Sequence, residues 1–81
     1  MLMFEVRIPK MGASTVEVDL TKWYVSVGTS VVPGQILAEV ESEKTNIEIE
    51  AETAGVVSEI LVDEGSVTEV GTVICRINTE Q

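Results

Sequence analysis

Apolar and polar residues alternate along several short stretches of this chain. Residues 4–8 alternate between apolar and charged side chains, and residues 46–51 show the same alternation. A period of two residues is typical of a strand that buries one face and leaves the other in solvent. Turn signals such as Pro33-Gly34 separate the stretches, and no window has the sustained 3.6-residue period of an amphipathic helix. The pattern predicts an all-β chain of short strands.

Two of the longer stretches change the phase of their alternation midway. In the first half Leu20 and Trp23 belong to opposite phases, so the alternation slips near residues 21–22. In the second half the equivalent slip lies between Val57 and Ile60. A β-bulge that bends one strand from sheet to sheet produces such a slip. We therefore expect a bulge at both places.

The second half of the chain repeats the first. The offset that brings Gly28 onto Gly65 also brings Gly34 onto Gly71 without a gap. A spaced pair of glycines repeated at one offset indicates an internal repeat. The repeat predicts two similar four-stranded units, related by an approximate two-fold axis and packed as a flattened β-barrel or sandwich (a barrel-sandwich hybrid). A length of 81 residues predicts a single domain spanning residues 1–81.

The segment between the two halves, residues 41–45, has a special place in this symmetry. The repeat offset carries it onto both chain ends, so the two-fold axis is expected to place this turn opposite the termini. A tether attached at Gln81 would then hold Lys44 outward.

The charge of the chain narrows the choice of partners. Five Lys and Arg residues against fourteen Asp and Glu residues give a net charge of −9, which repels phosphate backbones and anionic lipid headgroups. No apolar stretch approaches the length of a transmembrane helix, and the start is too short for a signal peptide. We expect a soluble protein that binds neither nucleic acid nor membrane.

Residue types that are missing exclude most catalytic chemistry. The sequence has no His and one cysteine, Cys75, so neither a zinc site nor histidine acid–base catalysis is expected. A lone cysteine forms no internal disulfide and fits a reducing compartment, the cytoplasm or the matrix of a eukaryotic mitochondrion. Cys75 aligns with Ala38 and Trp23 with Ile60 in the repeat, so both are expected to pack in or against the core.

The segment from Glu41 to Ala51 resembles the lipoylation hairpin of lipoyl domains, in which a lysine after an acidic residue lies on a β-turn between two acidic strands. The likeness covers nearly the whole chain. It includes Ile8-Pro9, the loop Met11 to Thr15, Trp23, Gly28, Gly34, Ala54-Gly55-Val56-Val57 and the stretch from Gly65 to Gly71. The chain is therefore similar to the lipoyl domain of the dihydrolipoamide acyltransferase component of 2-oxo acid (or acetoin) dehydrogenase complexes, within the biotinyl/lipoyl attachment family.

The resemblance implies a non-catalytic carrier domain, the N-terminal part of an acyltransferase, that is monomeric when isolated. Lipoate would be joined covalently to Lys44 and would act as a swinging arm. The implied partners are a lipoate ligase or lipoyl transferase, a 2-oxo acid decarboxylase, dihydrolipoamide dehydrogenase and the acyltransferase catalytic domain. The implied recognition residues are Glu43 and Thr45 beside the lysine, and Gly12, Ala13 and Ser14 in the first surface loop.

Three alternatives compete with this interpretation. The family usually has Asp before the lysine and Ala or Val after it, whereas this chain has Glu43 and Thr45. A biotinyl carrier domain of a biotin-dependent carboxylase has the same architecture, but methionines typically flank its lysine. An unmodified adaptor module usually carries long helical insertions in this hairpin, and this chain has none. A self-contained enzyme is disfavoured, because the chain has no histidine and no expected metal site for catalysis.

Acidic residues flank the hairpin, and they either steer basic partners or serve solubility. They are Glu39, Glu41, Glu43, Glu48, Glu50 and Glu52.

Overall fold

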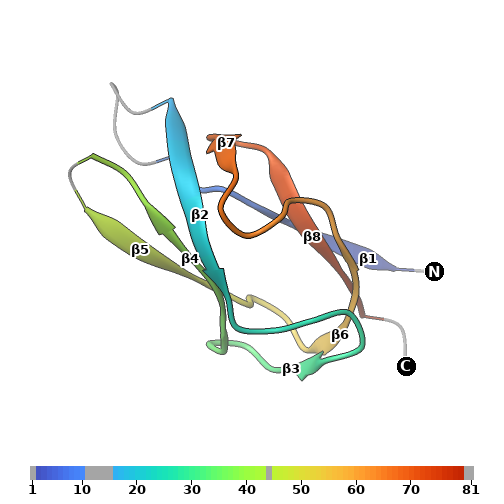
Figure 1. Ribbon diagram of the computed structural model, residues 1–81. Coiled ribbons are helices and arrows are strands. Elements are labelled where there is room, and N and C mark those ends of the chain that lie inside the picture. The colour runs from blue at the N-terminus through green and yellow to red at the C-terminus, as the bar shows by residue number, and fades with distance from the viewer. Residues whose placement is uncertain (1, 11–15, 44, 80–81) are drawn as a thin grey trace.

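The computed structural model describes residues 2–10, 16–43 and 45–79 (Figure 1). Within these residues it contains eight strands and no helix, which confirms the predicted all-β class. The strands are β1 (Met3–Arg7), β2 (Glu17–Trp23), β3 (Ser30–Val31), β4 (Ile36–Glu41), β5 (Asn46–Glu50), β6 (Gly55–Ile60), β7 (Val67–Glu69) and β8 (Val73–Asn78).

The strands form two four-stranded sheets whose neighbours all run antiparallel. One sheet has the order β1-β8-β6-β3 and the other β5-β4-β2-β7. The two sheets of the expected sandwich are thus confirmed, but the halves of the repeat do not coincide with them. Each sheet takes two strands from each half, because β1 pairs with the last strand of the chain, β8, while β2 pairs with β4.

Hydrogen bonds repeat together with the sequence, which supports the expected two-fold relation. The Gly28 N–H donates to the Val57 carbonyl oxygen at 2.8 Å, and the Gly65 N–H donates to the Leu20 carbonyl oxygen at 2.7 Å. Gly28 and Gly65 have φ of 97° and 89°, in the left-handed region that favours glycine. Both glycines therefore lie in tight turns at equivalent places in the two halves.

Both predicted bulges are confirmed. The pairing register shifts between Leu20 and Lys22, where β2 pairs with β4. It shifts again between Val57 and Glu59, where β6 pairs with β8. The slip in hydrophobic phase therefore marked a real break in each ladder, at equivalent places in the two halves.

The core is aliphatic and lies between the two sheets. Its buried residues are Val6, Ile8, Val18, Leu20, Val25, Val31, Leu37, Ala38, Val40, Ile49, Ala51, Val57, Ile74, Cys75 and Ile77. The predicted core position of Cys75 is confirmed, and burial raises the pKa of its thiol to about 11. Trp23 is half-buried against this core, and its Nε1–H donates to the Val62 carbonyl oxygen at 2.9 Å.

Thr68 is a buried hydroxyl residue whose loss we expect to stabilise the fold. Its side chain is 5% exposed, and its Oγ1 has no hydrogen-bond partner in the described part of the chain. The equivalent residue of the first half is Val31, which is also buried. We expect Thr68→Val to raise the free energy of unfolding by about 1 kcal/mol, because an unsatisfied buried hydroxyl costs energy that a methyl group does not.

Urea unfolding of the variant and the parent chain measures this difference. Thr21→Val is the control, since the Thr21 hydroxyl donates to the Glu39 carbonyl oxygen at 3.1 Å and its removal should lower stability. A Thr68→Val variant that unfolds at a lower urea concentration than the parent would contradict the expectation.

Candidate functional site at the β4–β5 hairpin

The β4–β5 hairpin lies at one end of the molecule (Figure 1). The two strands pair from Ile36 opposite Glu50 to Glu41 opposite Asn46. Figure 1 shows that this end of the hairpin lies across the molecule from the start of β1 and the end of β8. Those two strand ends pair with each other at Met3 and Asn78. The described part of the hairpin turn therefore lies at the opposite end of the molecule from the paired ends of β1 and β8, as predicted.

Ser42 and Thr45 close the turn that joins the two strands. The Ser42 N–H donates to the Thr45 carbonyl oxygen at 2.8 Å. The Thr45 N–H donates to Ser42 Oγ at 3.1 Å, and that hydroxyl donates to the Thr45 carbonyl oxygen at 3.1 Å. The turn residue Glu43, like Thr45, is exposed. The turn is therefore fixed at its base and open to solvent at its described flanks.

Several predicted site residues lie outside the described residues. These are Lys44, which stands between Glu43 and Thr45 in the sequence, and Gly12, Ala13 and Ser14, which were predicted to lie in the first surface loop. The strand that follows this loop is described, and it lies beside the hairpin, because Asp19 of β2 pairs with Glu41 of β4.

An acidic groove runs beside the hairpin. Its volume is about 510 Å³, and it is lined by Glu17, Asp19, Glu41, Ser42, Glu43 and Val67. The sequence analysis identified the carboxylates of β4 and β5 but did not include Glu17 and Asp19 of β2. The alternation of polar residues in β2 signalled that these two are exposed, but their closeness to the hairpin depends on strand pairing, which no local pattern specifies.

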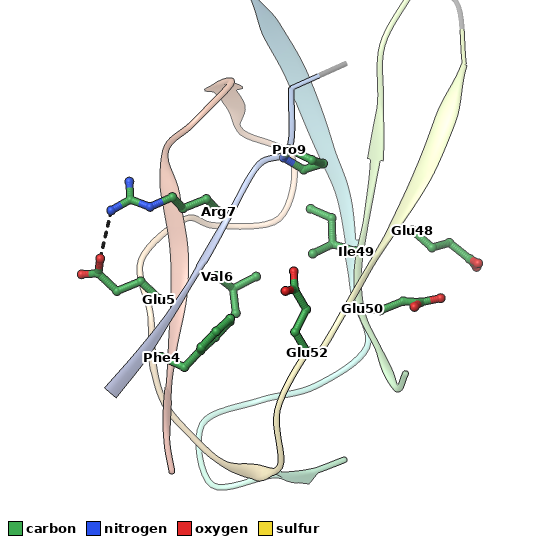
Figure 2. A pocket seen from close by; sticks show the side chains of 9 residues that line it. All are labelled: Phe4, Glu5, Val6, Arg7, Pro9, Glu48, Ile49, Glu50 and Glu52. Carbon is green, nitrogen blue, oxygen red and sulfur yellow. Dashed lines mark hydrogen bonds and ion pairs between the residues drawn. The ribbon is translucent and has the colours of Figure 1, made fainter. Parts of the chain in front are cut away.

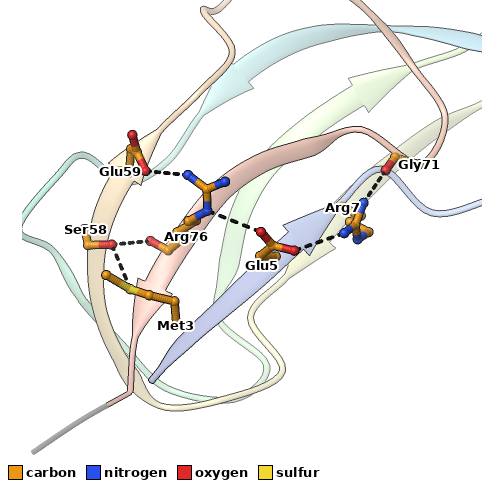
Figure 3. A network of polar contacts seen from close by, with 7 residues as sticks. All are labelled: Met3, Glu5, Arg7, Ser58, Glu59, Gly71 and Arg76. Atoms are coloured by element: carbon orange, nitrogen blue, oxygen red, sulfur yellow. Dashed lines mark hydrogen bonds and ion pairs between the residues drawn. The ribbon is translucent and has the colours of Figure 1, made fainter. Parts of the chain in front are cut away.

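The outer face of the sheet without the hairpin has balanced charges (Figure 3). Arg76 of β8 donates to Glu59 of β6 at 2.6 Å and to Glu5 of β1 at 3.3 Å. Glu5 also accepts from Arg7 at 3.0 Å, and Arg7 donates to the Gly71 carbonyl oxygen at 3.0 Å. The hydrogen bonds that Arg76 donates to Glu59 and, to a lesser extent, to Glu5 raise the pKa of its guanidinium. Two cations and two anions therefore alternate across three strands.

The equivalent face of the hairpin sheet is acidic instead. In the two-fold relation β4 corresponds to β8 and β5 corresponds to β1. Glu39 of β4 therefore takes the place of Arg76. Glu48 and Glu50 of β5 take the places of Glu5 and Arg7. Lys22 of β2 takes the place of Glu59. Glu39 lies directly opposite Glu48 in the β4–β5 ladder, and like charges in that relation are unfavourable. The balanced face shows that this fold does not require the excess negative charge, so the acidity belongs specifically to the sheet that carries the hairpin.

A second cavity lies along the free edges of β1 and β5 (Figure 2). Its volume is about 470 Å³. Apolar side chains such as Phe4 and Ile49 line it together with carboxylates such as Glu48 and Glu52. Of the described residues predicted for recognition, neither Glu43 nor Thr45 lines this cavity, whereas the flanking carboxylates Glu48, Glu50 and Glu52 do.

Within the described ranges 2–10, 16–43 and 45–79, no group of three or more His, Cys, Asp or Glu side chains could hold a metal ion. Within the same ranges, no helix is long and apolar enough to cross a membrane.

Comparisons with known proteins identify the family. The family model described as "Biotin-requiring enzyme" matches residues 4–77. The chain is 40% identical over 75 residues to the dihydrolipoyllysine-residue acetyltransferase component of the pyruvate dehydrogenase complex of Staphylococcus epidermidis. It is 39% identical over 75 residues to the same component of Staphylococcus aureus. Each match covers 93% of the chain, and the chain spans about 17% of the length of these relatives.

A solved structure has the same fold. The lipoyl domain of the 2-oxoglutarate dehydrogenase complex from Azotobacter vinelandii matches with a TM-score of 0.76 and 23% sequence identity, covering 91% of this chain and 94% of that domain. The chain therefore belongs to the biotinyl/lipoyl attachment family. Within that family, the curated relatives support a lipoyl domain better than a biotinyl domain, which confirms the family expected from the sequence.

Proposed function

We propose that this chain is a lipoyl carrier domain in which lipoate forms an amide with Nζ of Lys44. The observation that supports this most strongly is the hairpin turn. Hydrogen bonds between Ser42 and Thr45 close its base, and only Glu43 and Lys44 stand between these two residues in the sequence. A paired hairpin with a two-residue tip holds one side chain in a defined position for a modifying enzyme.

The residues around Lys44 fit this modification. Glu43 and Thr45 are exposed, so an acyl chain attached between them does not displace a packed neighbour. Lys44 carries the one side-chain amine between Lys22 and the C-terminus. The amine attacks the carboxyl carbon of an activated lipoate, the amide bond forms, the activating group leaves, and the nitrogen loses a proton to solvent.

The chain and the cofactor have separate tasks in this proposal. When bound, lipoate supplies a redox-active disulfide that carries an acyl group. The domain supplies placement and exposure. Lys44 is thus a site of attachment and not a catalytic amine.

The proposed partners follow from the family and from charge. We propose a lipoate ligase or lipoyl transferase as the modifying enzyme. We also propose a 2-oxo acid decarboxylase, an acyltransferase catalytic domain and dihydrolipoamide dehydrogenase as the enzymes that the arm visits, in the cytoplasm or the mitochondrial matrix. The acidic outer face of the hairpin sheet favours encounters with basic surfaces, in a salt-dependent way. Glu43 and Thr45, with the loop residues Gly12, Ala13 and Ser14, are the proposed recognition residues of a monomeric carrier.

The alternative function is that of a biotinyl carrier domain, and one experiment separates the two. The 81-residue chain is coexpressed with a lipoate ligase and lipoate, or with a biotin ligase and biotin, and the intact mass is measured. We expect an increase by one lipoyl group in the first case and no increase in the second, because Glu43 and Thr45 replace the methionines typical of biotinyl domains. A chain that gains biotin and no lipoate would overturn the proposal.

A further inference from the structure

One hydroxyl binds both backbone polar groups of the residue that follows the lysine. Ser42 Oγ accepts a hydrogen bond from the Thr45 N–H at 3.1 Å and donates to the Thr45 carbonyl oxygen at 3.1 Å. The Ser42 N–H donates to the same carbonyl oxygen at 2.8 Å. We refer to these three hydrogen bonds between Ser42 and Thr45 as the hydroxyl clasp.

The opposite end of the molecule contains a matching arrangement. The two-fold relation places Thr79 in the position of Ser42 and Leu2 in the position of Thr45, just as it places the Met3–Asn78 pair in the position of the Asn46–Glu41 pair. The Thr79 N–H donates to the Leu2 carbonyl oxygen at 3.0 Å, and Thr79 Oγ1 donates to the same oxygen at 3.3 Å. The fold therefore provides this hydroxyl position at both ends, and only one of them carries a lysine.

The hydroxyl clasp holds both backbone polar groups of Thr45, the residue that follows Lys44. Holding both the N–H and the carbonyl oxygen of Thr45 fixes the orientation of its peptide planes, and the peptide plane at the Thr45 nitrogen is shared with Lys44. A side chain on a long flexible stem is presented reproducibly only if its own backbone is fixed. Ser42 therefore influences where the Lys44 backbone can lie.

We propose that Ser42 is a positioning residue for the lipoylation of Lys44 and acts through its hydroxyl on the Thr45 backbone. This inference rests on the proposed function. Removing the hydroxyl leaves the lysine and every charge in place, but it releases the turn that the modifying enzyme must recognise. The equivalent hydroxyl of Thr79 has no such role, because its end of the molecule lies across the fold from the lysine.

The test compares three variants of the 81-residue chain with the parent. They are Ser42→Ala, Ser42→Thr and the matched control Thr79→Ala. For each, kcat and KM for lipoate transfer by a lipoate ligase are measured, together with the melting temperature and the hydrogen-exchange rate of the Thr45 amide. The exchange rate reports on the turn whether or not the chain is lipoylated.

We expect Ser42→Ala to lower kcat/KM at least about fivefold, the equivalent of one net hydrogen bond, and to speed exchange of the Thr45 amide. Ser42→Thr keeps the hydroxyl and should restore both values. Thr79→Ala should lower the melting temperature as much as Ser42→Ala does, yet leave kcat/KM and the Thr45 exchange rate at the parent values.

Each other outcome overturns a specific part of the proposal. If the parent chain takes up lipoate and Ser42→Ala takes it up at the same rate, the positioning role of Ser42 is wrong while the proposed function stands. If Thr79→Ala loses as much kcat/KM as Ser42→Ala, the effect is one of global stability. If the parent chain takes up no lipoate, the proposed function is wrong and the role of Ser42 falls with it.

Discussion

Replacement of Lys44 by Arg is expected to abolish lipoylation. It should leave the free energy of unfolding within about 0.5 kcal/mol of the parent, because the residues on either side, Glu43 and Thr45, are exposed. The guanidinium keeps the positive charge but stays protonated and does not act as a nucleophile. Intact mass after incubation with ligase and lipoate measures the first effect, and urea unfolding measures the second. Two other lysines remain in the variant as internal controls, Lys10 and Lys22. Lipoate on either of them would contradict the assignment.

A rearranged hairpin tests whether the position of the lysine matters as well as its presence. Exchanging Glu43 and Lys44 conserves composition and net charge but moves the amine to the other residue of the tip, where it leaves the turn in a different direction. We expect the rate of lipoylation to fall at least about tenfold, because small displacements of a reacting group are costly. An exchanged variant that is modified as fast as the parent would show that the ligase reads only the presence of a lysine.

Replacement of Gly55 by Ala is expected to lower the free energy of unfolding by about 2 kcal/mol. A Cβ at this position of β6 would collide with the backbone oxygen of Asn78 and would lie 2.7 Å from Ile77 Cγ2. The first contact is with backbone that the β6–β8 ladder holds in place, so the strand itself must move. Overpacking of this kind costs about 1–3 kcal/mol.

Urea unfolding measures this loss, and the adjacent Val56→Ala variant is the control. Val56 is 42% exposed, so its truncation should change stability by less than about 0.5 kcal/mol. If Gly55→Ala unfolds at the same urea concentration as the parent, the strand has room that the structure does not show.

Local patterns predicted the strands and bulges, because burial of one face of a strand leaves a period of two in the sequence. They could not predict partners. Nothing in residues 17–19 indicates that β2 lies beside the hairpin strand β4, and this pairing is what brings Glu17 and Asp19 into the acidic groove. The interleaving of the two halves escaped prediction for the same reason.

The candidate site was only partly readable from sequence. Lys44 and its flanking residues were identified from their place between the two halves and from the family resemblance. The role of Ser42 was not, because a serine in a turn has many possible partners, and only the fold shows that its hydroxyl holds Thr45. The equivalence of the two halves does not extend to every position: Gly55 aligns with the buried Val18, yet it has no room for a side chain.

The pairing of Leu2 with Thr79 has a consequence for the connectivity of the fold. Two of the three hydrogen bonds between Ser42 and Thr45 have a counterpart between Thr79 and Leu2, so a two-residue linker from Thr79 to Leu2 would close the backbone into a ring with a hairpin at each end. New ends could then be opened at either hairpin without altering a strand of either sheet. The domain is thus topologically a closed ring, and its termini could lie at either end. The end that carries the lysine differs from the other in its side chains and not in its backbone path.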